Sequence, residues 1–177
     1  AIINKSVLRI EYRTFTDKSY KWTIHPYYLK EYNNRWFLFG YCNEENSITN
    51  IPLDRIDDIE QIKAEYKQSS INFETYFDNV IGVTVINKEK EIIRLQFSSH
   101  RFPYILTKPL HNTQRIIDID NHIIEITVIP NRELDSLILR FGKDVKVLKP
   151  ESFREHIQSI LKDANKLYTD VQIDCTE

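Results

Sequence analysis

Two arginines, a histidine and several aromatic residues lie close together in the sequence between residues 20 and 56. The basic members are Arg35, Arg55 and His25, and Phe37 shares the expected strand face of Arg35. Guanidinium groups pair with anions and aromatic faces stack on planar rings, so this mixture suits a ligand that carries both bases and phosphates. A half-buried hairpin with basic edges would have a similar composition, because aromatic residues are common in strands. The residue types alone leave both interpretations open.

Other chemistries have weaker support in the sequence. Cys42 and Cys175 form no CxxC pair, which argues against a zinc cage or a disulfide framework and favours a reducing cytoplasm. Three glycines are too few for most phosphate-binding loops, and no GxSxG, P-loop or GxGxxG motif occurs. The histidines also lack the spacing of a metal motif such as HExxH. They are His25, His100, His111, His122 and His156. We therefore expect no metal, no cofactor and no enzymatic activity.

Charge is distributed unevenly along the 177 residues. The formal net charge of −2 argues against a general polyanion binder, because nonspecific nucleic-acid affinity comes from accumulated positive charge. Residues 5–35 nevertheless carry seven basic and three acidic side chains, whereas residues 36–62 carry one arginine and six acidic side chains. An anion site is therefore expected to be local.

No stretch of the sequence suggests a membrane segment. A membrane span needs about 18 consecutive apolar residues, and no run approaches that length. No signal peptide opens the chain. The chain contains no methionine and enters a strand-like pattern within its first ten residues. These two features suggest that an N-terminal portion precedes Ala1, although removal of an initiator methionine would explain the first equally well.

The first third of the chain reads as short strands joined by tight turns. Asn33 and Asn34 tolerate the positive φ angles of a tight hairpin, and Pro26 is expected to end the second strand. Trp36 is expected in the core. The expected strands cover residues 6–13, 20–24, 35–42 and 47–53, followed by a helical turn that leads into a fifth strand before residue 62. Five such strands close naturally into a small barrel.

From residue 63 the pattern changes. Residues 63–70 are polar and mark the expected boundary between the two modules of the chain. After them, the spacing of Phe73, Tyr76, Phe77 and Val80 predicts a short amphipathic helix. Beyond residue 83 the expected order is β-α-β-β-α-β, that of a ferredoxin-like unit. Asn131 is expected to cap its second helix. A last helix begins after Pro150, and its expected buried stripe is Phe153, Ile157, Ile160, Leu161, Ala164 and Tyr168.

An ordered set of short motifs in the first 56 residues resembles a known family. The motifs are Tyr12, His25-Pro26-Tyr27-Tyr28-Leu29, Asn34-Arg35-Trp36-Phe37-Leu38, Gly40-Tyr41 and Leu53-Asp54-Arg55-Ile56. Together they resemble the WYL domain, named after a Trp-Tyr-Leu tripeptide that here reads Trp36-Phe37-Leu38. Phenylalanine in place of tyrosine loses a hydroxyl group but keeps an aromatic face.

The downstream half resembles the C-terminal extension that commonly follows a WYL domain. The motifs are Phe77-Asp78-Asn79-Val80-Ile81-Gly82-Val83, Pro109-Leu110-His111-Asn112-Thr113-Gln114, Asn131-Arg132-Glu133-Leu134, Ile138-Leu139-Arg140-Phe141-Gly142 and Val147-Leu148-Lys149-Pro150. The resemblance thus covers nearly the whole chain. It implies a WYL domain over residues 1–66, a linker helix over residues 67–82 and the extension over residues 83–177.

The resemblance also implies a fold and a role. The fold is α+β, with a small Sm-like, SH3-type barrel followed by a ferredoxin-like domain and a C-terminal helix. The role is that of the sensory part of a bacterial transcriptional regulator, located in the cytoplasm, which binds single-stranded nucleic acid or a nucleotide-like effector. Family members often form homodimers and contact DNA through an N-terminal winged helix-turn-helix, which this chain lacks. The positions that match the family's pocket are Tyr12, Arg13, His25, Tyr27, Arg35, Phe37 and Arg55.

Two alternatives to an effector-binding module stay open at this point. The same surface could bind protein, as a standalone interaction or dimerisation module. An enzyme acting on nucleic acid is less favoured, because the sequence offers no clustered carboxylates for metal-assisted chemistry.

Overall fold

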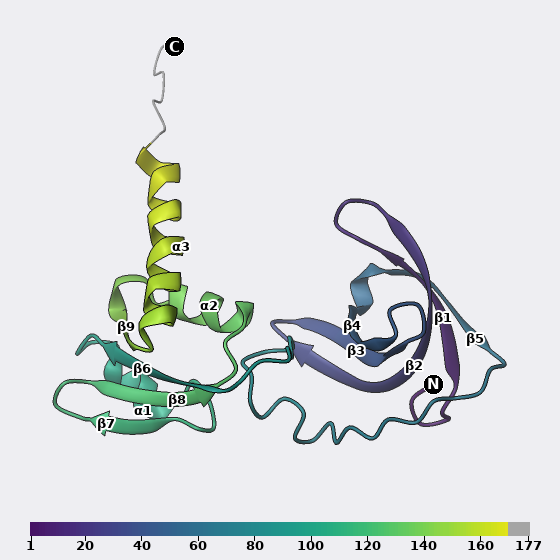
Figure 1. Ribbon diagram of the computed structural model, residues 1–177, viewed down its shortest axis with the longest axis horizontal. Coiled ribbons are helices and arrows are strands. Elements are labelled where there is room, and N and C mark those ends of the chain that lie inside the picture. The colour runs from purple at the N-terminus through teal and green to yellow at the C-terminus, as the bar shows by residue number, and fades with distance from the viewer. Residues whose placement is uncertain (170–177) are drawn as a thin grey trace, which may run out of the picture. The chain divides into compact units, whose positions relative to one another are not determined.

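The computed structural model describes residues 1–169 and divides the chain into two compact units (Figure 1). Unit 1 contains Ala1–Phe77 and Gly82–Thr84, and unit 2 contains Asp78–Ile81 and the residues from Val85 onward. Each unit contains one antiparallel sheet, and the described helices make the chain mixed α+β, as the sequence predicts. Within the described part of the chain, no helix combines the length and the apolar character needed to cross a membrane. Cys175 lies outside the described residues.

The sheet of unit 1 has five strands in the order β4-β3-β2-β1-β5. A single 3-10 turn, η1 (Leu53–Arg55), links the two edge strands β4 and β5. This helical turn and the strand after it agree with the sequence-based expectation. The strands are β1 (Val7–Arg13), β2 (Ser19–Tyr32), β3 (Arg35–Cys42), β4 (Ser47–Pro52) and β5 (Ile56–Ile62).

Alternation of side chains gives this sheet one apolar face. The tight turn between β2 and β3 has φ angles of 49° at Asn33 and 59° at Asn34, as the sequence predicts. Successive strand residues point to opposite faces, and the apolar set gathers on one of them. The buried members of this cluster are Leu8, Ile10, Ile24, Leu38, Cys42 and Ile51.

The prediction that Pro26 ends the second strand is wrong. β2 continues to Tyr32, and Pro26 pairs with Gly40 of β3 at a register shift. Proline has no N–H to donate, and a bulge is where a strand tolerates it. The prediction that Trp36 lies in the core is also wrong, because its side chain is 49% exposed. The β2–β3 hairpin extends past β1, which pairs with β2 only as far as Ile24.

The amphipathic helix expected over residues 73–80 is not formed. These residues make consecutive turns, and their aromatic rings pack on the outer face of β2 and β3. Phe73 stacks on Tyr28 with ring centroids 5.3 Å apart, and Phe77 meets Phe39 edge-on at 4.9 Å. The spacing of the aromatic residues therefore reflects packing on a sheet and not a helical stripe.

The sheet of unit 2 has four strands in the order β7-β8-β6-β9, and each neighbouring pair is antiparallel. The elements follow the predicted order of strands and helices. They are β6 (Glu91–Phe97), α1 (Phe102–Thr107), β7 (Arg115–Asp118), β8 (Ile123–Val128), α2 (Arg132–Leu139), η2 (Gly142–Asp144), β9 (Val145–Lys149) and α3 (Glu151–Thr169). A large apolar core joins strands and helices. It includes Ile93, Leu95, Ile124, Ile126, Leu134 and Ile138, each at most 2% exposed.

The apolar stripe of α3 is buried only in its first half. Phe153 and Ile157 are buried and Ile160 packs against the core, as predicted. Leu161 is 50% exposed and Tyr168 is 85% exposed, so the residues described by the structure leave the second half of the predicted stripe largely uncovered.

Asn131 connects the start of α2 to a distant part of unit 2. Its side chain accepts a hydrogen bond from the Leu134 N–H and donates one to the carbonyl of Ile81, each at 2.9 Å. Asn131→Ala should therefore lower the free energy of unfolding by about 2 kcal/mol, the upper end for loss of a helix cap. Chemical denaturation followed by circular dichroism measures this change. Asn165→Ala, on the exposed surface of α3, should stay within about 0.5 kcal/mol, and an equal loss in both variants would contradict the prediction.

Candidate functional site

A row of three stacked aromatic rings lies on the apolar face of the β1–β2 hairpin. The pairing of these strands places Tyr12 opposite Tyr20 and Ile10 opposite Trp22, so all these side chains share one face. The rings of Tyr12 and Trp22 have centroids 4.7 Å apart and an interplanar angle of 14°. Those of Trp22 and Tyr20 are 5.9 Å apart at 26°. Tyr20 is 42% exposed, so the row leads from the core outward to solvent.

Arg55 places a guanidinium group at the inner end of this row. It comes from the turn η1, and its Nη1 donates a hydrogen bond of 3.4 Å to the Tyr12 hydroxyl. The same guanidinium lies over the ring of Phe15, an exposed residue of the β1–β2 loop. Among the described residues, no carboxylate lies within ion-pair distance of Arg55. Its positive charge is therefore available to an anion.

The other two arginines expected in the pocket have carboxylate partners. Arg35 pairs with Asp54 of η1 at 3.1 Å, and Arg13 pairs with Asp57 of β5 at 2.5 Å. Both ion pairs are partly exposed, so each contributes little free energy and leaves its arginine free to exchange partners. Asp54 precedes Arg55 directly and Asp57 follows it by two residues, so the two ion pairs bring Arg35 and Arg13 to the turn η1 and the start of β5.

His25 and Tyr27 belong to a second group on the outer face of the sheet. His25 is 2% exposed, and its Nδ1 accepts a hydrogen bond of 3.0 Å from the backbone N–H of Lys67. Its Nε2 lies 3.2 Å from Oδ1 of Asn43 and donates to it, because Nδ1 serves as the acceptor. Both ring nitrogens are thereby occupied, and His25 holds the segment after β5 against the sheet.

Two tyrosines complete this attachment. The Tyr66 hydroxyl donates to the carbonyl of Pro26 at 2.6 Å, and the Tyr27 hydroxyl donates to the carbonyl of Lys67 at 2.9 Å. Burial raises the pKa of both phenols, which keeps them protonated as donors. The Lys67 ammonium lies 4.3 Å from the centroid of the Tyr41 ring. We call residues 63–77 the strap.

The structure thus separates the residues expected in one pocket. Tyr12, Arg55, Arg35 and Arg13 gather around η1 and the start of β5, whereas His25 and Tyr27 hold the strap. Arg35 reaches η1 through Asp54, and Arg55 belongs to η1, so neither arginine lies with His25. Phe37 is half-buried on β3 opposite Pro52.

Sequence reasoning missed the stacking row as a unit. Tyr20 and Trp22 lie two positions apart in an expected strand and so share a face, but their contact with Tyr12 depends on the register of the hairpin. A turn centred on residues 14–18 would have paired Tyr12 with Tyr20, so the signal was present in the sequence. No sequence pattern predicts the position of Phe15 over Arg55, because Phe15 belongs to the loop between β1 and β2 and that loop has no regular periodicity.

The side chains offer little for metal or thiol chemistry. In residues 1–169, no three His, Cys, Asp or Glu side chains lie close enough together to hold a metal ion. Cys42 is buried in unit 1 and unpaired, and burial raises the pKa of its thiol, which disfavours the reactive thiolate.

Comparison with known proteins agrees with the division of the chain. The model of the WYL domain matches residues 1–61, and the model of the WCX domain matches residues 89–164. A search of curated proteins found no match.

Solved structures with similar chains include two that are much longer than this one. Proteasome accessory factor B/C (PafBC) of Arthrobacter aurescens is 17% identical, with a TM-score of 0.36. A CRISPR Cas-related protein is 12% identical, with a TM-score of 0.55, which is a likeness of fold. The alignments cover 97% and 96% of this chain but only 26% and 49% of the two longer chains. From the two domain matches, the chain is a WYL-domain protein in which a WYL domain is followed by a WCX domain.

Proposed function

We propose that this protein is the sensory part of a bacterial transcriptional regulator. In this proposal unit 1 binds single-stranded nucleic acid or a nucleotide-like effector at the site made by Tyr12, Tyr20, Trp22 and Arg55. Occupancy then changes the activity of an upstream winged helix-turn-helix, and the protein acts in the cytoplasm as a homodimer. The role is one of binding rather than catalysis.

The observation that carries the proposal is the Arg55 guanidinium beside the aromatic row. A cation without a carboxylate partner attracts a phosphate, and Tyr12 orients it through a hydrogen bond of 3.4 Å. The exposed rings are Phe15, over the guanidinium, and Tyr20, at the other end of the row, and both offer faces on which bases stack whatever their sequence. A ligand with alternating phosphates and bases satisfies both features at once.

Charge around the site supports a local contact with a few phosphates. The carboxylates of Asp54 and Asp57 already neutralise Arg35 and Arg13. A phosphate would have to compete with these carboxylates, which limits the number of strong contacts. A short oligonucleotide or a single nucleotide therefore fits the site better than a long duplex.

The finer fold assignment is part of this proposal. A five-stranded sheet whose edge strands are linked by a 3-10 turn supports an Sm-like, SH3-type barrel for unit 1. The strand order β7-β8-β6-β9 with helices in the β-α-β-β-α-β positions supports a ferredoxin-like fold for unit 2. We place the domains at residues 1–66 and 83–177, with residues 67–82 between them.

The strap gives the site a route to the rest of the chain. It follows β5, which carries Asp57, the partner of Arg13. A ligand that displaces Asp57 from Arg13 would disturb β5 and the strap anchored by His25. An effector shifts an equilibrium only through such differential contacts.

Titration of a labelled single strand of about 10 nucleotides, a length within the usual site size, tests the proposal across a salt series. The double variant Arg35→Ala plus Arg55→Ala should bind at least tenfold more weakly. Its plot of log affinity against log salt should be shallower by at least about 0.7, the value for one phosphate contact of a single strand, which corresponds to the contact of Arg55. Fluorescence anisotropy with DNA and RNA strands provides the measurement.

The matched control is Arg9→Ala. Arg9 lies on the opposite face of β1 and pairs with Glu60, so its loss should leave affinity and salt slope unchanged. Affinity that the double variant does not lower would rule out the proposed site.

An interaction module is the second candidate, and one surface favours it. A cavity of about 450 Å³ in unit 1 is lined almost entirely by aliphatic side chains. They include Ile3, Leu29, Leu53 and Ile59, which are 94%, 41%, 38% and 55% exposed. Exposed apolar patches of this kind mark contact sites for protein. A site around Arg55 that binds neither DNA nor RNA would favour this candidate.

A further inference from the structure

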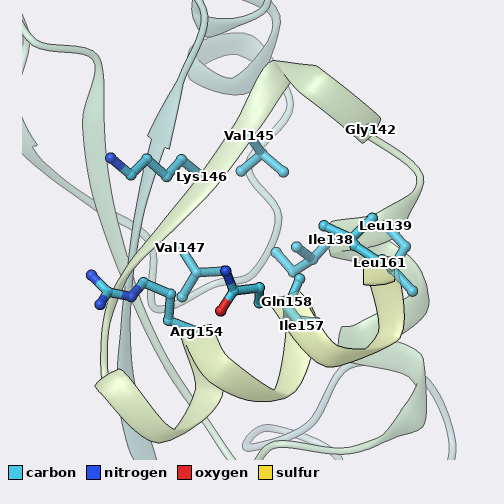
Figure 2. Close-up of a pocket in the computed structure, with 10 residues that line it drawn as sticks. All are labelled: Ile138, Leu139, Gly142, Val145, Lys146, Val147, Arg154, Ile157, Gln158 and Leu161. Carbon is cyan, nitrogen blue, oxygen red and sulfur yellow. The ribbon is translucent and has the colours of Figure 1, made fainter. Parts of the chain in front are cut away.

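Unit 2 has an apolar groove between α2, β9 and α3 (Figure 2). Its cavity measures about 360 Å³, which lies within the usual range of about 300–1,000 Å³ for small-ligand pockets. Its apolar lining comes from Ile138, Leu139, Val145, Val147, Ile157 and Leu161. The described lining is aliphatic and contains no aromatic ring, so it suits a flexible hydrocarbon chain better than a planar base.

The floor of the groove is buried, and its apolar end is open. Ile138, Val147 and Ile157 are at most 5% exposed, whereas Leu161 is 50% exposed. Figure 2 shows Leu161 and Gly142 at the same end. A Cβ atom on Gly142 would have no atom within 4 Å beyond its chain neighbours. A ligand at this end would therefore cover apolar surface without displacing a side chain, which favours binding.

Two cationic side chains lie at the other end of the groove. Figure 2 shows Lys146 and Arg154 there, with the Gln158 amide between that end and the apolar one. Among the residues that the structure describes, Lys146 has no ion-pair partner. Arg154 pairs with Glu151, the first residue of α3, and both side chains are exposed. Such an exposed pair is weak, so the anionic group of a ligand can replace Glu151.

The charge balance at this end fits a singly charged headgroup. Lys146 and Arg154 are both positive, and Glu151 offsets one of the two charges. A carboxylate carries one negative charge, whereas a phosphate monoester carries about 1.5 to 2 at neutral pH. The planar fork of an arginine also matches the two oxygens of a carboxylate. A carboxylate is therefore the headgroup that the groove favours.

Positions along α3 set the length of the ligand. Arg154, Ile157, Gln158 and Leu161 lie three or four residues apart in overlapping pairs, so they share one face of the helix. Arg154 and Leu161 are seven residues apart, about 10.5 Å along the axis at about 1.5 Å per residue. An extended chain of single bonds advances about 1.2 Å per bond, so a chain of about ten carbon atoms covers this distance.

We propose that the groove of unit 2 binds a monomeric medium-chain carboxylate, a fatty acid of about ten carbon atoms. The carboxylate pairs with Arg154 and Lys146, and the hydrocarbon chain lies on Val147 and Ile157 with its end against Leu161. The groove lies in unit 2, so its occupancy does not depend on effector binding by unit 1.

Calorimetric titration of the full chain with sodium decanoate tests the proposal. From octanoate to decanoate, affinity should rise about two- to fourfold per added CH₂, because a fully buried CH₂ contributes a factor of about four. Dodecanoate should gain less, because its last carbon atoms extend past Leu161. Decanol and decylamine have the same chain length without the negative charge, and they should bind at least about tenfold more weakly than decanoate.

Substitutions at both ends of the groove locate the ligand. Arg154→Ala and Leu161→Asp should each weaken decanoate binding at least about tenfold. Both side chains are about half-exposed, so unit 2 stays folded, which circular dichroism verifies. Glu151→Gln removes the carboxylate that competes for Arg154 and should strengthen binding. Lys162→Ala is the matched control, because Lys162 also lies on α3 but outside the described lining, and it should leave the affinity unchanged.

Three outcomes would overturn the proposal. Decanoate that does not bind the full chain at millimolar concentration would exclude this class of ligand. Decanol that binds as tightly as decanoate would leave no role for the two cations. A decanoate affinity that Arg154→Ala and Leu161→Asp both leave unchanged would place the ligand elsewhere on the protein.

Discussion

Trp22→Leu should weaken binding of a short single strand by about tenfold or more. Leucine keeps apolar contact with the core but removes the indole that stacks between Tyr12 and Tyr20, and so removes the support that holds the exposed ring of Tyr20 in position for a base. Stacking of one base on an aromatic side chain contributes about 1–3 kcal/mol, and about 1.4 kcal/mol corresponds to a factor of ten. Anisotropy titration at a fixed salt concentration measures the change, and thermal melting of the variant confirms that it is folded.

Trp36→Leu is the matched control. Trp36 is the other tryptophan of the chain and is 49% exposed on β3, and among the described residues its ring makes no stacking contact with the row. Its loss should leave the affinity unchanged. With only two tryptophans, each variant also isolates the fluorescence of the other. Ligand should quench Trp22 in the Trp36→Leu chain and leave Trp36 unaffected in the Trp22→Leu chain, and the reverse pattern would contradict the site.

Gly40→Ala should destabilise unit 1 by about 3 kcal/mol, the upper range for overpacking. A Cβ atom at this position would lie 2.6 Å from the carbonyl oxygen of His25 and 2.7 Å from Cγ2 of Ile24. The carbonyl belongs to the backbone of the paired strand, so it moves only if the β2–β3 ladder shifts. The melting temperature of unit 1 should fall by about 15 °C, given about 4–8 °C per kcal/mol in a domain of this size.

Gly142→Ala provides a contrast within the same chain. Gly142 has a φ angle of +54°, but no atom lies within 4 Å of the added Cβ. The cost is then only that of a left-handed backbone conformation, about 1–2 kcal/mol, and it falls on unit 2. Calorimetry of the full chain measures both variants, and equal losses would contradict the steric account of Gly40.

The residues that matched the family as one set lie in two groups. Arg55 lies beside the aromatic row, whereas His25 and Tyr27 use their polar atoms to hold the strap. In the proposed function, only the first group contacts the ligand. Substitutions at His25 should accordingly affect folding of unit 1 before they affect ligand contacts.

Local rules were sufficient for much of the fold. Period-two alternation located β1 and β3, tolerance of positive φ located the turn at Asn33 and Asn34, and a capping side chain located the start of α2 at Asn131. These features depend on residues within a few positions of each other. The spacing of Phe73, Tyr76 and Phe77 predicted a helix that does not form, because packing of the aromatic rings on the sheet outweighed a weak helical propensity.

The sequence by itself determined the family, the order of strands and helices and the residue types that a base-and-phosphate ligand requires. The tertiary structure decided which of those residues meet. The register of the β1–β2 hairpin brought Tyr20 and Trp22 to Tyr12, and the turn η1 brought Arg55 to the same place. His25 does not join this group, because its ring accepts a hydrogen bond from the backbone N–H of Lys67 in the strap, 42 residues further along the chain. Such partners are fixed by contacts between distant segments, which local sequence patterns do not encode.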